Sequence, residues 1–181
     1  GYVLHYAGEV PGNKAIVSLL VLYGALDAHV HPADDLSRQF LAAVFLGDAA
    51  RVRSLLGRHP RLAAAPDGRG DHPIHHAARN GDTDVVRMLI EHGADVNARN
   101  TRGHTVLYCA GGHGHVETLR LLLERGSDPD VRFTSDGKTL TEWLAQYPGD
   151  LRYAPINEAL RAHKAQPYGR GTGNAADRRL H

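Results

Sequence analysis

The chain has 181 residues, of which 42% are hydrophobic and 23% are charged, as is typical of a folded, soluble protein. Its formal net charge of +1 gives no general attraction to nucleic acid or to an anionic membrane. Cys109 is the only cysteine, which excludes an intramolecular disulfide and favours a reducing compartment, so we predict a cytoplasmic protein. The longest apolar run, residues 15–26, is shorter than the about 20 residues of a membrane span, and we expect it to be a buried helix.

The first part of the chain contains two predicted helix pairs that match a later, clearer repeat only loosely. In residues 1–33, a short stretch at 4–7 precedes the apolar helix, as expected of a repeat that lacks its first residues. In residues 34–66, Asp48 precedes a second helix, where its side chain can cap free backbone N–H groups. Because the chain begins with Gly1, we expect that it starts inside a repeat and lacks its native N-terminus.

The central part contains two clear copies of one pattern, residues 67–99 and 100–132, in which three pairs of glycines have the same spacing. Apolar residues at helical spacing predict two helices in each copy. Pro73 suits the first position of a helix, Thr105 suits a helix cap, and Gly93 suits a helix end. The glycine pairs are Gly70 and Gly103, Gly81 and Gly114, and Gly93 and Gly126.

The C-terminal part contains a divergent copy, residues 133–165, with Thr139 as the expected cap of its first helix and residues 155–163 as its second helix. A divergent, polar copy is the expected end of a stacked array, because one of its sides faces water. Residues 166–181 are rich in Gly and Arg and are predicted to be a disordered tail.

This pattern resembles the ankyrin repeat, and residues 93–98 (GADVNA) are similar to the phrase that ends the repeats of that family. The resemblance covers roughly residues 1–165 in about five copies. It implies an all-α solenoid of stacked helix–turn–helix units with short loops similar to β-hairpins. One copy alone buries too few apolar side chains to offset the entropy of ordering it, so neighbouring copies must stack.

The resemblance also implies a non-catalytic protein–protein interaction scaffold, because ankyrin arrays usually bind partners on a concave face. Loop tips and the exposed positions of the first helices form that face. Six of the aligned residues are cationic and one is anionic, which predicts a basic stripe for a protein partner with acidic segments. Alternatively, arginine is simply the common base at exposed positions of this chain. The predicted residues are Phe45, Leu46, Arg69, Asp71, Arg79, Asn80, Arg99, Arg102, His104, His113, Arg132 and Lys138.

Phe45 and Leu46 align with Arg79 and Asn80 and leave two interpretations open. In one, the apolar pair is an anchor beside the basic stripe, suited to a peptide with a hydrophobic residue near acidic ones. In the other, Phe45 packs against the neighbouring repeat.

Other chemistries have weaker support in the sequence. His72, His75 and His76 lie one helical turn apart, which can suit a metal ion, but the resemblance makes His75 a structural residue, and no acidic or cysteine ligand is expected near His76. Lys138 lies in a segment similar to the end of a phosphate-binding loop, but Arg132 occupies the position of a required glycine. Nucleic acid is an unlikely partner because the face lacks the interleaved aromatic residues on which the bases of single strands stack.

We therefore predict a monomer that binds no membrane and has no catalytic, cofactor or metal site. A further alternative is that the array is the regulatory segment of a longer enzyme or effector chain.

Overall fold

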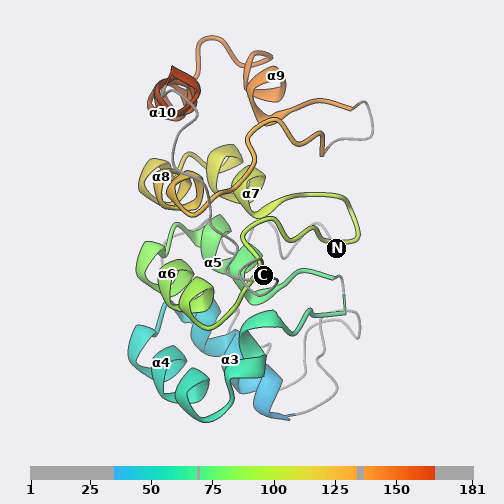
Figure 1. Cartoon of the computed structure of the whole chain (residues 1–181), viewed down its shortest axis with the longest axis vertical. Helices are drawn as coiled ribbons and strands as arrows, with labels where there is room; N and C mark the ends of the chain where they lie inside the picture. Colours follow the sequence, from blue (N-terminus) through green and yellow to red (C-terminus); the bar gives the residue numbers. More distant parts are fainter. Residues whose placement is uncertain (1–34, 69, 134–136, 166–181) are drawn as a thin grey trace, which may run out of the picture.

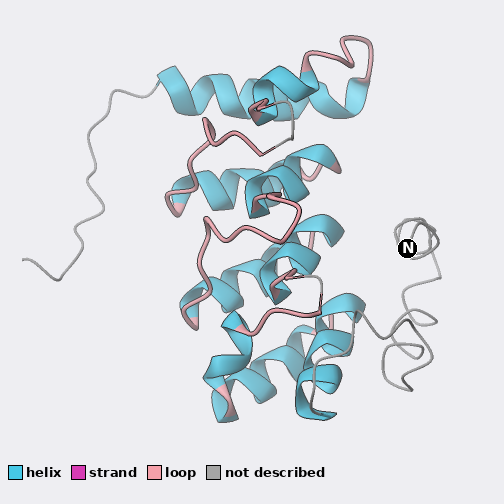
Figure 2. Cartoon of the chain, turned by 90° about the vertical axis from the view of Figure 1, so that its right-hand side faces the viewer, coloured by secondary structure: helices cyan, strands magenta, loops and turns pink. Residues whose placement is uncertain are grey.

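The computed structural model describes residues 35–68, 70–133 and 137–165. The expected first copy (1–33), Arg69 and the expected tail (166–181) lie outside the described residues. Helices follow one another in pairs that stack along the long axis of the molecule (Figure 1). Figure 2 shows the same stack after a quarter turn, with loops that connect each pair to the next.

The described residues form eight α-helices and two short 3-10 helices, and no strand. First helices α3, α5, α7 and α9 contact one another along one layer, and second helices α4, α6, α8 and α10 form the other layer (Figure 1). The predicted all-α solenoid of helix pairs is confirmed. The α-helices are α3 (Asp35–Leu46), α4 (Ala49–Arg58), α5 (Pro73–Asn80), α6 (Thr83–Glu91), α7 (Val106–Gly112), α8 (Val116–Glu124), α9 (Leu140–Leu144) and α10 (Ala154–Ala165), and the 3-10 helices are η1 (Pro60–Ala64) and η2 (Leu151–Tyr153).

Helix ends lie where local rules place them. Pro73 begins α5, where its missing N–H has no partner to lose. The Thr105 hydroxyl accepts a hydrogen bond of 3.1 Å from the backbone N–H of Tyr108 and caps α7. Gly93 follows α6 with a φ of 89°, a left-handed conformation that favours glycine.

A continuous hydrophobic core runs between the two layers and crosses every helix pair. Small residues let the first helices approach closely: a Cβ on Gly111 of α7 would lie only 2.7 Å from Cδ2 of Leu140 in α9. Stacking of neighbouring pairs thus buries the faces that a single pair leaves in water. Fully buried core side chains include Val52, Leu56, Ile74, Leu89, Leu119, Leu122, Leu140, Ile156 and Leu160.

Between helix pairs, the chain forms hairpin-like loops. Their described residues are here called the first finger (66–68 and 70–72), the second finger (99–105) and the third finger (132–133 and 137–139). Each finger is closed by a backbone hydrogen bond: Asp67 N–H to Asp71 O (2.9 Å), Asn100 N–H to His104 O (3.1 Å) and Phe133 N–H to Lys138 O (3.1 Å). The fingers project from the first-helix layer, away from the second helices (Figure 1). The predicted hairpin-like loops are therefore present.

Within the described part of the chain, the helices lack the combination of length and apolar character that a membrane crossing requires.

Candidate functional site

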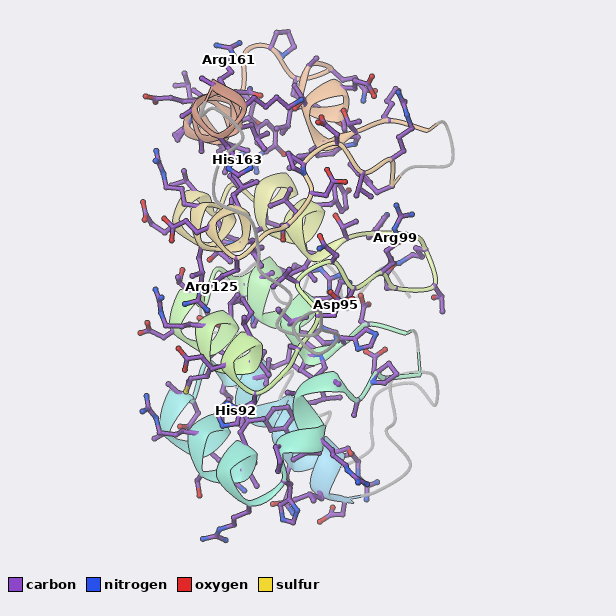
Figure 3. All side chains as sticks on the ribbon, in the orientation of Figure 1. His92, Asp95, Arg99, Arg125, Arg161 and His163 are labelled. Carbon is purple, nitrogen blue, oxygen red and sulfur yellow. The ribbon has the colours of Figure 1, made fainter. Side chains whose placement is uncertain are left out.

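The candidate site is the surface made by the three fingers and the exposed positions of the first helices, here called the finger face. Arg99, Arg102 and Arg132 are exposed on it, and the side chains of Arg102 and Arg132 keep 51% and 65% of their surface accessible. Figure 3 shows Arg99 on the finger side of the molecule and Arg125 and Arg161 on the second-helix side. Three of the predicted cations therefore face solvent on neighbouring fingers.

Contacts within and between the fingers hold these arginines in place. Nη2 of Arg99 donates a hydrogen bond of 3.1 Å to the backbone O of Arg132, which joins the second finger to the third. Arg132 donates to the backbone O of Gly137 across its own finger, and its Nη1 lies 3.5 Å from Oε2 of Glu142. Nη2 of Arg102 lies 3.6 Å from Oδ2 of the buried Asp71, so two of the three guanidinium groups have a carboxylate partner, although both keep more than half of their side-chain surface accessible.

Asp71 is buried, contrary to the expectation that it is exposed on this face. Only 2% of the residue is accessible, and its Oδ1 accepts a hydrogen bond of 2.7 Å from Nδ2 of Asn100. Burial alone raises the pKa of Asp71, but the charges of His76 and Arg79 and the Asn100 hydrogen bond together lower it to about 2. Asp71 is therefore a buried carboxylate that joins the first two fingers.

Arg79 and Asn80 are half-buried at the joint between copies. Nη2 of Arg79 lies 3.5 Å from Oδ1 of Asp71 and 3.6 Å from Sγ of Cys109. Nδ2 of Asn80 donates a hydrogen bond of 3.3 Å to the backbone O of Phe45. Burial raises the pKa of the Cys109 thiol, which Arg79 lowers in part, so Cys109 is a neutral core residue, as expected.

His75 lies between neighbouring copies, as the resemblance implies. Its Nδ1 accepts a hydrogen bond of 3.1 Å from the backbone N–H of His72, so its Nε2 carries the proton toward the carbonyl oxygens of Ala98 (3.2 Å) and His104 (3.3 Å). Burial, the largest cause, lowers the pKa of His75 to about 4, although Asp71 opposes the shift.

His76 has acidic neighbours, and the expectation that none lies near it is wrong. Its Nε2 is 2.9 Å from Oδ2 of Asp67, and ligand atoms of Asp67, Asp71 and His76 lie within 4.8 Å of one another. Arg79 and Asn100 already contact Asp71, and Oδ1 of Asp67 accepts from the backbone N–H of Asp71. We interpret the cluster as an ion-pair network that shapes the first finger, with Arg79 and Arg102 both beside Asp71.

Phe45 packs on this network, with its ring centroid 4.5 Å from that of His76. The structure thus favours the interpretation that Phe45 packs against the neighbouring copy. Leu46, the next residue, is 45% exposed.

An aromatic cluster that was not expected from the sequence lies at the C-terminal part of the finger face. The Tyr108 ring of α7 lies 4.1 Å from Phe133 of the third finger and 5.4 Å from Trp143 of α9. Tyr147 lies 5.0 Å from Trp143. The aromatic cluster comprises Tyr108, Phe133, Trp143, Tyr147 and Tyr153.

The remaining predicted residues border the aromatic cluster or the α7–α9 region. The half-buried His104 ring lies 4.6 Å from Tyr108. Nδ1 of His113 is 2.9 Å from the backbone O of Cys109, and Nζ of Lys138 donates to Oε1 of Gln146 at 3.3 Å. The structure thus brings the predicted residues of the second and third fingers together, whereas Asp71, Arg79 and Asn80 belong to the joint behind them.

A family model described as ankyrin repeats (3 copies) matches residues 40–133, just over half of the chain. The chain belongs to the ankyrin-repeat family. This ankyrin array is similar over 55 residues (30% of the chain, 47% identity) to a probable E3 ubiquitin-protein ligase XBOS33 of Oryza sativa subsp. japonica, and covers 11% of that protein. Over 53 residues (29% of the chain, 49% identity) it is similar to serine/threonine-protein kinase VIK of Arabidopsis thaliana, of which it covers 12%.

A third relative is ankyrin repeat domain-containing protein 35 of Homo sapiens, which is 36% identical over 63 residues, 35% of this chain and 6% of that protein. The array thus spans only between 6% and 12% of the length of these three relatives.

The outer face of the ankyrin array, made by exposed residues of the second helices, has a different charge pattern. Arg53, Arg87 and Arg120 occupy equivalent exposed positions in α4, α6 and α8. Acidic residues lie one turn before and after this row of arginines in α6 and α8, so charges of both signs alternate on the outer face. They are Asp84, Glu91, Glu117 and Glu124, all of them exposed.

Proposed function

We propose that this ankyrin array is a non-catalytic scaffold that binds a protein partner with acidic segments on its finger face. Ankyrin repeats are generally protein-interaction modules, and the family match places this chain among them. The observation that carries the finer proposal is the row of exposed guanidinium groups on neighbouring fingers, Arg99, Arg102 and Arg132. We further propose that the protein is monomeric and cytoplasmic and needs no cofactor.

Several arginines must act together in such a site. A single exposed ion pair contributes only about 0.2–1 kcal/mol, so one arginine cannot set the affinity for a partner. A row of them attracts an acidic segment and fixes its register along the fingers. Arginine is also over-represented among the residues that dominate interface energies.

A second proposal is that the array is the regulatory segment of a longer enzyme or effector chain. Two relatives, named as an E3 ubiquitin-protein ligase and a protein kinase, match this chain over about a tenth of their lengths. In that case the array itself still performs no chemistry and selects the partner.

Affinity capture from a lysate of the source cells tests the first proposal. The bait proteins are the wild type, a finger variant (Arg99→Glu, Arg102→Glu, Arg132→Glu) and an outer-face variant (Arg53→Glu, Arg87→Glu, Arg120→Glu) with the same charge change. We expect a protein retained by the wild type and the outer-face variant but lost by the finger variant. A partner retained equally by all three, with helical content unchanged, would contradict the proposal.

A salt series on the captured complex separates protein from nucleic acid. Binding to nucleic acid releases counterions, so the logarithm of affinity falls steeply and linearly with the logarithm of salt concentration. We expect a shallower dependence and retention after nuclease treatment of the lysate.

A further inference from the structure

We propose that the exposed part of the aromatic cluster, Trp143 and Tyr147, is the anchor site for a bulky apolar side chain of the partner, within a segment whose acidic residues contact Arg132 and Lys138. This inference rests on the proposed function and assigns the partner a more specific chemistry.

The aromatic cluster reaches the surface at α9. Tyr147 is 46% exposed and Trp143 is half-buried, whereas Phe133 and Tyr153 are 3% and 5% exposed. The two buried rings thus support the accessible ones, which include the half-buried Tyr108 as well as Trp143 and Tyr147. Exposed aromatic area of this kind is typical of interfaces, in which Trp and Tyr residues dominate the binding energy.

The neighbouring rings of Tyr108 and Tyr153 hold Trp143 in position. Trp143 meets Tyr108 edge to face, with centroids 5.4 Å apart and an interplanar angle of 85°, and meets Tyr153 at 5.9 Å and 71°. The Tyr153 hydroxyl donates a hydrogen bond of 3.1 Å to the backbone O of Gly112, which ties the cluster to α7. Rings that are already ordered lose little conformational freedom when a ligand binds.

The spacing of the rings shows where the apolar side chain would lie. The centroid separations of 4.1, 5.0, 5.4 and 5.9 Å are those of rings in mutual contact. An enclosed cage for a cationic group is therefore absent from the described cluster. The apolar side chain would instead lie across the outer surfaces of Trp143 and Tyr147.

Lys138 and Arg132 lie near the anchor site, so we expect the partner segment to carry acidic residues. Lys138 is linked to α9 by its hydrogen bond with Gln146, whose own Nε2 donates to the backbone O of Trp143 at 3.1 Å. Arg132 directly precedes Phe133 and is 65% exposed. Glu142, whose side chain is 50% exposed, lies 3.5 Å from Arg132, so an acidic residue of the partner would have to compete with Glu142 for this guanidinium, while Lys138 lies beside the aromatic cluster.

The opposite end of the array provides a matched control. Leu46, at the end of α3, aligns with Tyr147, which lies three residues after α9, and has nearly the same accessibility, 45% against 46%. Its neighbour Phe45 is turned toward His76, however, and Leu46 is no member of the ring cluster. Leu46 therefore tests whether any exposed apolar residue of the finger face suffices.

The test begins with a random dodecapeptide library displayed on phage and selected on the wild-type array. We expect enriched peptides to share a Leu or Phe flanked by Asp and Glu. Trp143 is the only tryptophan of the chain, so its emission reports directly on the anchor site. Addition of a selected synthetic peptide without tryptophan should shift this emission and protect it from quenching by acrylamide.

Single-residue variants then test whether the selected peptide contacts Tyr147. Tyr147→Ser should weaken binding of the selected peptide by about tenfold or more, as expected for a residue that dominates an interface. Tyr147→Phe, which keeps the ring, should remain within about twofold of the wild type. Leu46→Ser should weaken binding less than Tyr147→Ser does. Because Tyr147 is exposed, these variants should fold, and circular dichroism checks it.

Other outcomes separate this inference from the proposed function. If selected acidic peptides lose binding in the finger variant but are insensitive to Tyr147→Ser and leave Trp143 emission unchanged, the anchor site is overturned and the proposed function stands. Peptides that bind equally well to the finger variant would overturn both. The anchor site is also overturned if no acidic–apolar peptides are enriched, or if single-stranded oligonucleotides quench Trp143 at lower concentrations than the peptides do.

Discussion

Asn100 donates a hydrogen bond of 2.7 Å from its Nδ2 to Oδ1 of the buried Asp71, and this bond joins the second finger to the first. One copy later, the equivalent positions are held by His104 and Phe133, whose rings meet edge on at 6.2 Å. The first joint is thus polar and the second is aromatic. This difference explains why the aromatic surface is confined to the C-terminal part of the finger face.

Replacement of Asp71 should strongly destabilise the array. Asp71→Ala leaves the half-buried Arg79 without its carboxylate and the buried Asn100 amide without its acceptor, so we expect a loss of about 3 kcal/mol. Asp71→Asn keeps an acceptor oxygen and should cost less. Urea unfolding followed by circular dichroism measures both values, and a change below about 0.5 kcal/mol for Asp71→Ala would show that the joint contributes little.

The stability of the array should fall as the pH is lowered from 6.5 to 4, in part because of His75. Its folded-state pKa of about 4 lies below the ordinary 6.5, so in this range the unfolded chain binds a proton that the folded chain does not. The contribution is complete above pH 6.5 and is lost at up to about 1.4 kcal/mol per pH unit, about 3 kcal/mol in total. Asp71, with a folded-state pKa of about 2, loses its contribution only below about pH 4.

The comparison of wild type with His75→Gln isolates this effect from the other histidines. Urea unfolding at several pH values between 7 and 4 should show a flatter pH dependence for the variant. Parallel curves for the two proteins would mean that His75 titrates normally in the folded state.

Gly81 and Gly93 should differ in their tolerance of alanine. Both have a positive φ, 75° and 89°, so Gly→Ala costs about 1–2 kcal/mol at either position. A Cβ on Gly81 would also overlap the imidazole of His115, whereas a Cβ on Gly93 meets nothing within 4 Å. We expect Gly81→Ala to be the more destabilising by at least about 1 kcal/mol in urea unfolding. Equal losses would show that His115 moves aside freely.

Most of the fold could be predicted from the sequence because the interactions that begin and end its helices are local. Pro73, Thr105 and Gly93 act through backbone geometry and through hydrogen bonds within a few residues of themselves. The 33-residue spacing then requires that one helix pair stack on the next. None of these inferences depends on how a side chain of one copy meets a side chain of another.

The candidate site was harder to predict because it depends on such contacts. Asp71 and Arg102 both belong to fingers and their Oδ2 and Nη2 atoms lie 3.6 Å apart, yet Asp71 is buried beside Asn100 of the next finger while Arg102 remains exposed. Likewise, Tyr108 and Trp143 come from different copies and meet only in the stack. The sequence indicates only that Tyr108 and Trp143 lie on the first helices of successive copies, at the positions that His75 and Cys109 hold one copy earlier.

The most direct test of the central claim is the dissociation constant of the captured partner for the wild type, the finger variant and the outer-face variant at one salt concentration. If acidic segments bind Arg99, Arg102 and Arg132, charge reversal at these positions should weaken binding by at least about 30-fold, since three ion pairs are replaced by repulsions. Reversal of Arg53, Arg87 and Arg120 should change it by less than about threefold. Equal dissociation constants for the three proteins, or weaker binding by the outer-face variant, would contradict the account.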